Sequence, residues 1–488
     1  MPPSPAEGTD VAADEVPQRN VPLVVDLDGT LLKSDLLFES LAALLNRKPW
    51  MVFAIPFWLA RGKAHLKQRI ASLVELDLGD LPWDERVLAL VARERGRRTL
   101  MLCTASDEKL AGLVATHFGF FDEVVASDGR RNVSGGVKAD VIAARFGTRG
   151  FDYVGNARAD LFVWDRARFA IVANAGDALA RAAAGRCTVD QILPSEGGGL
   201  KQWLKALRLH QWLKNVLVFV PMLAAHRFLD PVAILHCVLA FLSFGLCASS
   251  VYLLNDLIGL ADDRRHPTKS KRPFAAGLLP LSQGLAASPC LALASFGLGY
   301  ALSPLFAGVL VLYWVLNLSY SLWLRRRVMA DVVVLAGLYT LRIVAGAVLL
   351  GTAISFWLLA FSMFLFLSLA MLKRYAELFG QRAKGASATF GRGYEVDDLP
   401  LLQSLGAASG YLAVLVLALY INSTASELLY RRPQVLWLLC PLLLYWISRA
   451  WMIAHRGLMR DDPVIFAATD RTSQITAVLC AAVAAGAI

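Results

Sequence analysis

Cysteine is scarce in this chain and is never arranged in pairs. Seven cysteines are scattered over 488 residues, and none stands in a CxxC spacing. Most of them lie in apolar stretches, where a thiol behaves as a small hydrophobic side chain. This pattern excludes a disulfide-stabilised scaffold and a cysteine-based zinc site.

Charge is scarce as well, and one sign prevails. Charged residues make up 18% of the chain against 56% hydrophobic residues, and the formal net charge is +10. The first 20 residues are acidic and Pro-rich, and they lack the apolar core of a signal peptide. These residues are predicted to form a disordered tail.

Long apolar runs are confined to the second half of the chain. Residues 1–200 have the mixed composition of a soluble protein, whereas the runs after residue 212 reach the roughly 20 residues that cross a bilayer. This predicts an all-α, polytopic membrane domain. We count nine candidate transmembrane helices, near 212–228, 232–255, 283–301, 304–322, 331–350, 356–374, 400–421, 434–453 and 472–488.

Basic residues are concentrated on one side of these spans. The connections after the second, fourth, sixth and eighth spans carry most Lys and Arg residues of this half, whereas the opposite loops hold only Arg227, Arg431 and Arg432. Basic loops stay on the cytoplasmic side of a membrane. The pattern predicts a multi-pass protein of the inner (cell) membrane with a cytoplasmic N-terminal domain, and it argues against nucleic acid as a partner.

A change of composition separates two domains. The sequence "LPSEGGGL" at 193–200 is typical of a flexible linker. Residues 201–215 are basic with interleaved Trp, Leu and His, which favours a helix along the membrane surface. We therefore predict four segments, namely a tail at 1–20, a soluble domain at 21–192, a linker at 193–200 and a membrane domain at 201–488.

Two aspartates follow the first predicted strand of the soluble domain. The sequence "VPLVV" at 21–25 is apolar throughout, as a buried parallel strand is, and leads directly to Asp26 and Asp28. Open α/β sheets bind ligands at the carboxyl ends of their strands. One carboxylate there can attack phosphorus while the other donates a proton to the leaving group, with Mg²⁺ offsetting their repulsion.

Two further apolar strands, at 97–106 and 151–164, also lead to polar residues. Over about residues 20–190 the domain resembles the haloacid dehalogenase (HAD) phosphatase superfamily. The residues that carry the resemblance are Asp26, Asp28, Thr104, Lys138 and Asp160.

The resemblance implies a Rossmann-like α/β domain with a helical cap, and it gives each polar residue a role. Asp26 would be the nucleophile and Asp28 the general acid and base. Thr104 and Lys138 would bind the phosphoryl group. Mg²⁺ would be bound by Asp26, Asp28 and Asp160.

The domain departs from this family at Asn156, where an aspartate is usual. An amide is a weaker Mg²⁺ ligand than a carboxylate, so the substitution predicts weaker metal binding. The interval 36–95 is predicted to hold the helical cap. Its apolar stretch at 49–60 contains Pro56 and is too short to span a membrane. It is predicted to belong to the core of the cap, and contact with a membrane is the alternative.

The second predicted span ends in acids that are followed at once by bases, in "VYLLNDLIGLADDRRHPTKSKRP" at 251–273. Asp256 and Asp263 are seven residues apart and would share one face of a helix. Two such carboxylates can bind Mg²⁺ together with a diphosphate, and the bases can bind the remaining phosphate oxygens. Asn255 and Asp256 stand at the end of an apolar run, where polar groups are costly and usually functional.

This motif resembles the UbiA superfamily of intramembrane prenyltransferases, and more closely its branch that includes decaprenyl-phosphate phosphoribosyltransferase. The resemblance covers about residues 203–488 and implies the UbiA fold of nine transmembrane helices with Mg²⁺. The chain departs from it at Gly259, where the family has an acid. It also has Leu335 four residues after Asp331, where aromatic prenyltransferases have a second acid, and this favours ligands with several phosphates.

The predicted site of the membrane domain therefore contains two metal ligands, Asp256 and Asp263, and a larger set of polar residues for the substrates. Two of these have structural alternatives, because Lys373 could pair with Glu377 along a helix and Tyr320 could lie in an interfacial belt. The predicted substrate-binding residues are Lys214, Asn255, Arg264, His266, Lys269, Arg272, Tyr320, Asp331, Arg342 and Lys373.

Three functions stay open at this point. The first is a Mg²⁺-dependent transfer from 5-phosphoribosyl diphosphate to a polyprenyl phosphate, with the HAD-like domain removing the 5-phosphate of the product. The second is transfer of a polyprenyl group from its diphosphate to an aromatic acceptor. The third is a membrane-bound binding module without catalysis. It is supported by Gly259 and Asn156, which stand where the two families have acids. The sequence predicts no oligomeric state.

Overall fold

The computed structural model describes residues 21–383, 393–459 and 462–488. The tail predicted at 1–20 lies outside these ranges. The described chain forms two compact units. The first unit contains residues 21–203 and 256–284, and the second contains residues 204–255 and 285–488.

The first unit is built on a six-stranded, all-parallel sheet with the strand order β3-β2-β1-β4-β5-β6. The order reverses beside β1, and ligands bind at such a switch point, outside the carboxyl ends of the strands. The sheet confirms the predicted α/β domain. Its strands are β1 (Leu23–Val25), β2 (Leu100–Asp107), β3 (Glu123–Ser127), β4 (Asp152–Gly155), β5 (Phe169–Ala175) and β6 (Thr188–Pro194).

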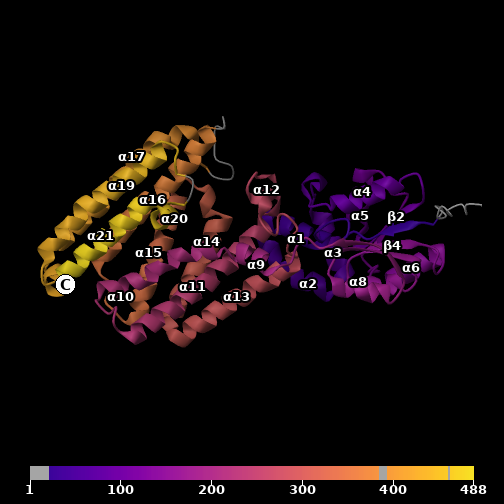
Figure 1. Cartoon of the computed structure of the whole chain (residues 1–488), viewed down its shortest axis with the longest axis horizontal. Coiled ribbons are helices and arrows are strands. Elements are labelled where there is room, and N and C mark those ends of the chain that lie inside the picture. The colour runs from indigo at the N-terminus through magenta and orange to yellow at the C-terminus, as the bar shows by residue number, and fades with distance from the viewer. Residues whose placement is uncertain (1–20, 384–392, 460–461) are drawn as a thin grey trace, which may run out of the picture. The chain divides into compact units, whose positions relative to one another are not determined.

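Helices cover both faces of this sheet (Figure 1). Helices α4 (Glu85–Glu94) and α5 (Glu108–Phe118) pack in the apolar cluster that contains Leu23 and Val25. The opposite cluster contains Val24, since successive side chains of a strand point to opposite faces. It is covered by α6 (Gly136–Phe146), α7 (Leu161–Trp164) and α8 (Asp177–Ala184).

A helical cap stands between β1 and α4, as predicted. Its apolar core is formed by Leu41, Leu44, Leu66, Ile70 and Val74. One face of the stretch at 49–60 packs against this core, as predicted, whereas its other face is exposed. The cap elements are α1 (Leu36–Arg47), the 3₁₀ helix η1 (Pro49–Ala54), α2 (Ile55–Ala60), α3 (Lys63–Leu73) and the 3₁₀ helix η2 (Leu78–Asp80).

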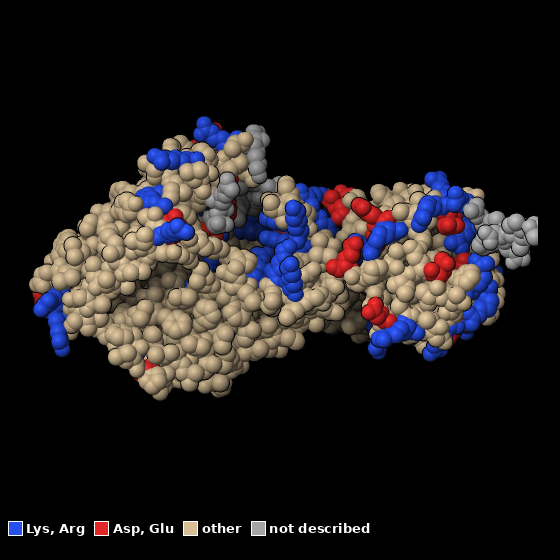
Figure 2. Space-filling model, viewed as in Figure 1, with Lys and Arg blue, Asp and Glu red and all other residues tan. Residues whose placement is uncertain are grey.

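Seven helices of the described chain are long and apolar enough to cross a membrane, so the protein is an integral, multi-pass membrane protein. Figure 2 shows the helices of the second unit as a nearly continuous surface without Lys, Arg, Asp or Glu. Two of the seven, α11 and α13, have one end in the first unit. The seven are α11 (Pro231–Ile258), α13 (Leu281–Leu302), α14 (Pro304–Leu322), α15 (Ala330–Leu350), α16 (Phe356–Arg382), α17 (Leu399–Ile421) with the 3₁₀ turn that extends it back to Val396, and α19 (Leu439–His455) with the 3₁₀ turn that extends it back to Pro433.

The first and ninth predicted spans differ from the prediction. Residues 212–228 do not form one helix, because they contain part of a 3₁₀ helix, η4 (Leu209–Phe219), and the short α10 (Val220–Ala224). The C-terminal helix α21 (Arg471–Ala487) has 17 residues, about 26 Å, which is shorter than a bilayer core of about 30 Å. The remaining short helices are α9 (Leu200–Leu207), α12 (Leu260–Arg265), α18 (Thr424–Leu429), α20 (Pro463–Thr469) and the 3₁₀ helices η3 (Arg158–Asp160), η5 (Lys269–Lys271), η6 (Leu324–Arg326), η7 (Val396–Asp398) and η8 (Pro433–Leu438).

Candidate active sites

Asp26 directly follows β1 and is paired with a buried lysine. The Nζ of Lys138 lies 2.6 Å from Oδ1 of Asp26 and donates a second hydrogen bond of 3.1 Å to the hydroxyl of Tyr153. Burial raises the pKa of the Asp26 carboxyl to about 7, although the charge of Lys138 acts in the opposite direction. The structure thus brings together the predicted nucleophile and the predicted phosphoryl-binding lysine.

Asp28 lies at the same edge of the sheet and is surrounded by hydrogen-bond donors. Its Oδ1 accepts from the backbone N–H of Leu36, and its Oδ2 accepts from the hydroxyls of Ser106, at 2.7 Å, and Thr104, at 3.3 Å. Burial, followed by the charge of Asp35, raises the pKa of Asp28 to about 6. A carboxyl that titrates near neutral pH suits a general acid and base.

Asp160 organises the turn that follows β4. Its Oδ2 accepts from the backbone N–H groups of Asn156 and Ala157, both at 2.9 Å, and its Oδ1 accepts from the Tyr153 hydroxyl at 2.8 Å. These bonds give Asp160 a structural role in fixing Asn156, and its predicted role as a metal ligand stays a prediction.

Asn156 itself faces the loop that carries the two aspartates. Its Oδ1 accepts from the hydroxyl of Thr30 at 3.2 Å. Gly29 has a φ of +78°, and a Cβ placed there would lie 2.0 Å from Nδ2 of Asn156. Only glycine fits this position, because both the backbone conformation and the close amide exclude a side chain.

Asn174, at the carboxyl end of β5, is a residue that the sequence did not single out. Its Nδ2 donates to the backbone carbonyls of Gly29 and Thr30, at 3.1 Å and 3.2 Å. Its φ of 52° is uncommon outside glycine, and such backbone conformations gather at functional sites. Asn174 therefore fixes the loop after β1 from the neighbouring strand.

A pocket of about 390 Å³ opens beside these residues within the first unit. Asp28, Asn156 and Asn174 line one side of it. Residues 277, 278 and 280–282, which precede and begin α13, line another. The backbone N–H of Gly198 donates to the carbonyl of Leu278 at 2.9 Å, so this wall is bonded to the chain that follows β6.

The segment 256–284 carries the second pair of predicted metal ligands. Helix α11 ends at Ile258 and α12 starts after Gly259, so Asp256 and Asp263 do not share one continuous helix as predicted. They nevertheless lie side by side, because Nη1 of Arg272 contacts Asp256 at 3.0 Å and Asp263 at 2.6 Å. Both carboxylates are buried, and they converge on one cationic group.

Arg264 and Arg265 of the same segment bind acids of the cap. The guanidinium of Arg264 forms a bidentate, buried ion pair with Glu39 of α1, at 2.6 Å and 2.9 Å, and donates to the carbonyl of Ala275. Arg265 forms exposed ion pairs with Asp77 and Asp80. Arg264 therefore anchors the segment to the cap, and its predicted role in binding substrate stays a prediction.

Removing Glu39 is expected to loosen this segment. The substitution Glu39→Ala leaves the guanidinium of Arg264 buried without its counter-charge, which typically costs about 3–5 kcal/mol. Backbone amides of residues 260–275 should then exchange with deuterium roughly 10²-fold faster in the full chain, measured by mass spectrometry. Arg265→Ala is the matched control, since its ion pairs are exposed, and an equal effect of both substitutions would contradict the anchoring role.

The other two predicted bases of the segment have different surroundings. Nδ1 of His266 lies 3.2 Å from the hydroxyl of Thr268, and Lys269 is exposed at the start of η5. Their predicted contacts with substrate stay predictions.

Two predicted lysines of the second unit meet at one acid. Lys214 and Lys373 both donate to Oδ2 of Asp462, at 2.9 Å and 2.6 Å. Burial alone would raise the pKa of Asp462, but the charges of Lys373 and Lys214 outweigh it and lower that pKa below its ordinary value. Lys373 thus forms its ion pair with Asp462, whereas Glu377, the partner considered along the helix, forms an ion pair with Arg374.

Arg374 is the fully buried centre of a second cluster and was absent from the predicted set. It donates to Asp331, to Glu377 at 2.6 Å and to the hydroxyl of Tyr320 at 2.8 Å. Asp331 also accepts from the hydroxyl of Tyr394. Asp331 and Tyr320 are thus brought together, as partners of an arginine.

Arg342 lies in the middle of α15, where a charge is costly unless it is paired or functional. Its donors contact the carbonyl of Leu338, the hydroxyl of Tyr313 and Oδ1 of Asn215. Nδ2 of Asn215 is buried and has no hydrogen-bond partner among the described residues. A buried donor without a partner destabilises the folded state, so Asn215 fits a position that binds a ligand oxygen.

Comparison with known proteins assigns the chain to a family. The model of the UbiA prenyltransferase family matches residues 216–469, just over half of the 488 residues. The chain belongs to the UbiA prenyltransferase family.

The chain is also similar to individual proteins and solved structures. An uncharacterised protein of Sinorhizobium fredii is 37% identical and covers 95% of this chain and 90% of its own length. The decaprenyl-phosphate phosphoribosyltransferase of Mycobacterium tuberculosis is 38% identical over 38% of this chain and 62% of its own length. A UbiA homolog from Archaeoglobus fulgidus bound to GPP and Mg²⁺ is 17% identical, covers 58% of this chain and 99% of its own, and has a TM-score of 0.45.

The first unit has its own structural neighbours. A phosphoserine phosphatase with a phospho-aspartyl intermediate analogue is 17% identical, covers 38% of this chain and 98% of its own, and has a TM-score of 0.25. The parallel sheet, the cap and the aspartates after β1 give this UbiA family member an N-terminal domain with a HAD-like fold.

The Mg²⁺ that both resemblances imply can be tested against the side chains present. In this UbiA family member the carboxylates of Asp256 and Asp263 already converge on a cationic nitrogen, so the pair fits a divalent cation. In the HAD-like domain Asp26, Asp28 and the amide oxygen of Asn156 supply oxygen ligands for Mg²⁺ at one edge of the sheet. This set carries one negative charge fewer than three carboxylates would. No cluster of three or more His, Cys, Asp or Glu residues is positioned for a metal in residues 21–383, 393–459 and 462–488.

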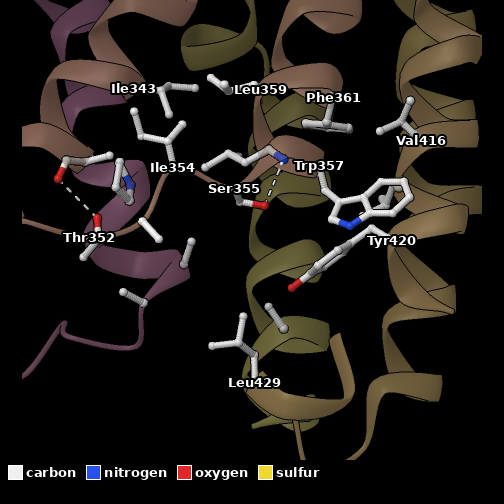
Figure 3. A pocket seen from close by; sticks show the side chains of 18 of the residues that line it. Ile343, Thr352, Ile354, Ser355, Trp357, Leu359, Phe361, Val416, Tyr420 and Leu429 are labelled. Carbon is white, nitrogen blue, oxygen red and sulfur yellow. Dashed lines mark hydrogen bonds between the residues drawn. The ribbon is translucent and has the colours of Figure 1, made fainter. Parts of the chain in front are cut away.

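An apolar pocket of about 540 Å³ lies in the second unit, among α10, α15, α16, α17 and α21. Figure 3 shows Ile343, Ile354 and Phe361 at its wall, with Trp357 beside Tyr420. Ile343 lies 12 residues along α15 from Asp331, about 18 Å at the rise of a helix. The pocket thus stands apart from Asp331, whereas the buried Arg342 directly precedes Ile343 in the sequence. The lining of the pocket suits a hydrocarbon chain.

Proposed function

We propose that the membrane domain transfers the phosphoribosyl group of 5-phosphoribosyl diphosphate to a polyprenyl phosphate, and that the HAD-like domain removes the 5-phosphate from the product. The observation that carries the proposal is the convergence of Asp256 and Asp263 on one cationic group, within a segment rich in Arg and Lys. The relatives named as decaprenyl-phosphate phosphoribosyltransferases support the choice of substrates.

In the proposed transfer, an oxygen of the lipid phosphate forms a bond to C1 of the ribose while the bond from C1 to the diphosphate oxygen breaks. The diphosphate leaves with the electron pair. Bound Mg²⁺ would neutralise charge on this leaving group. Asp256 and Asp263 would bind the metal, and Arg272 would then be released from the two carboxylates to bind phosphate oxygens.

The polar residues of the second unit suit anionic substrates. Lys214 and Lys373 share a single carboxylate, Asp462, so this group carries one more positive than negative charge. The unpaired Nδ2 of Asn215 can donate to a phosphate oxygen. The apolar pocket of this unit suits part of the polyprenyl chain.

In the proposed hydrolysis, Asp26 attacks the phosphorus of the 5-phosphate, and the bond from phosphorus to the ribose oxygen breaks. Asp28 donates a proton to that oxygen and then takes one from the water that cleaves the aspartyl phosphate. Residues 277–282 wall the pocket of this site and belong to the segment that carries Asp256 and Asp263. This shared segment supports a lipid-linked phosphate as the substrate of the HAD-like domain.

The test uses membranes that contain the full chain. Phosphoribosyl diphosphate labelled with ³²P in its 5-phosphate is supplied with a polyprenyl phosphate, and labelled prenyl diphosphate is supplied separately with an aromatic acceptor. We expect radioactivity to enter the lipid fraction from the first donor and then to appear as inorganic phosphate. Label that enters the product only from the prenyl donor would instead establish the aromatic prenyltransferase, and turnover of neither donor would favour a binding module.

A further inference from the structure

The stretch from η1 to α2, residues 49–60, is apolar on both of its faces. Met51, Ile55 and Trp58 pack against the core of the cap. On the other face, Trp50, Phe53 and Phe57 are exposed to 63%, 77% and 73%. A helix at the surface of a soluble domain normally presents polar side chains on its outer face. Contiguous exposed aromatic residues instead mark a surface that binds a partner or a membrane.

The charges around this stretch identify the partner. Arg47 and Lys48 precede it and Arg61 and Lys63 follow it, and all four are exposed. None of the four forms an ion pair within the described part of the chain. No Asp or Glu occurs between Glu39 and Glu75, so the part of the cap around this stretch carries only basic charges. An apolar face with a basic margin is complementary to a bilayer with anionic headgroups.

The length of the stretch specifies the mode of binding. Its 12 residues are too few to span a membrane, for which about 20 are needed. Aromatic side chains such as Trp50 lie favourably at the level of the headgroups. The seven apolar helices of the chain also keep a bilayer within reach of the first unit at all times.

We propose that residues 49–60 form an interfacial anchor, in which Trp50, Phe53 and Phe57 enter the headgroup region of the membrane while Arg47, Lys48, Arg61 and Lys63 bind anionic lipid headgroups. The anchor is part of the cap of the HAD-like domain. It does not depend on which phosphate ester that domain hydrolyses.

The test places spin labels on the full chain in nanodiscs that contain phosphatidylglycerol. Cys290 and Cys480 are first replaced by Ala, since the other five cysteines are buried. Single cysteines at Phe57 or Leu59 carry the label, and Leu113→Cys on α5 is the matched control, because Leu59 and Leu113 are exposed to nearly the same extent, 47% and 45%. Collisions of each label with oxygen, which dissolves in lipid, and with a water-soluble nickel chelate are measured.

We expect the labels at 57 and 59 to collide more with oxygen and less with nickel than the label at 113. The collisions of both labels with nickel should increase in nanodiscs of phosphatidylcholine alone. They should also increase when the four basic residues Arg47, Lys48, Arg61 and Lys63 are changed to Glu. Equal nickel access at 59 and 113 in phosphatidylglycerol would overturn the proposal. Protection from nickel that depends on protein concentration and not on lipid would do so too, because it would indicate a second copy of the chain on this face.

Discussion

The substitution Asp256→Ala is expected to lower the transfer of phosphoribosyl groups to lipid by at least about 10²-fold. It removes one of the two buried carboxylates that converge on Arg272, and preorganised charge of this kind is typically worth 10² to 10³ in rate. The loss should appear in kcat/KM for phosphoribosyl diphosphate, measured by the ³²P that enters the lipid fraction of membranes.

Asp262 offers a control one residue from the second carboxylate. Among the described residues Arg272 forms ion pairs with Asp256 and Asp263 and none with Asp262, which is also less buried than Asp263. We therefore expect the Asp262→Ala variant to transfer phosphoribosyl groups at close to the original rate. The Asp263→Ala variant should lose as much of this rate as the Asp256→Ala variant. Full transfer by Asp256→Ala would show that these carboxylates do not bind the metal of the reaction, and the proposed transferase mechanism would have to be abandoned.

The second large effect is expected for Asp26→Asn, which should separate the two proposed activities. An amide cannot act as the nucleophile toward phosphorus, and loss of a nucleophile typically lowers the rate by roughly 10³-fold or more. With 5-³²P-labelled phosphoribosyl diphosphate, the variant should still label the lipid, but the label should stay there instead of appearing as inorganic phosphate.

Asn156→Asp is the informative companion of this variant. It restores the carboxylate that the HAD family usually has at this position, so it should lower the Mg²⁺ concentration at which phosphate release is half-maximal.

Release of inorganic phosphate by Asp26→Asn at the original rate would show that another enzyme in the membranes performs the hydrolysis. Asp107→Asn, which changes the N-cap of α5, controls for the general loss of a carboxylate from this domain.

Much of the soluble domain could be predicted from local patterns. The apolar strand predicted at 21–25, with Asp26 at its end, follows from the continuous burial of a parallel strand. In the structure Lys138 contacts Asp26 and Thr104 contacts Asp28. The proximity of Asp256 and Asp263 was also predicted, and Asp256 was singled out because an acid at the end of an apolar run is costly without a function.

The missed residues are those whose meaning depends on contacts far along the chain. Glu39 has no distinctive feature within the sequence of its helix. Its role depends on an ion pair with Arg264, which lies 225 positions later. Asp462 likewise gains its role only from Lys214 and Lys373. A spacing of seven residues also does not reveal that the helix breaks at Gly259 between the two acids. An apolar stretch such as 49–60 cannot by itself show which of its faces is covered.

The wall formed by residues 277–282 has a practical consequence for tests of the proposed phosphatase activity. A truncated fragment that stops at the linker would contain every aspartate of that site but would leave its pocket open to water on one side. The backbone bond between Gly198 and Leu278 would also be lost. Substrate affinity and selectivity measured on such a fragment would be lower than those of the full chain. A fragment that ends at the linker is therefore unsuitable for measuring the proposed hydrolysis.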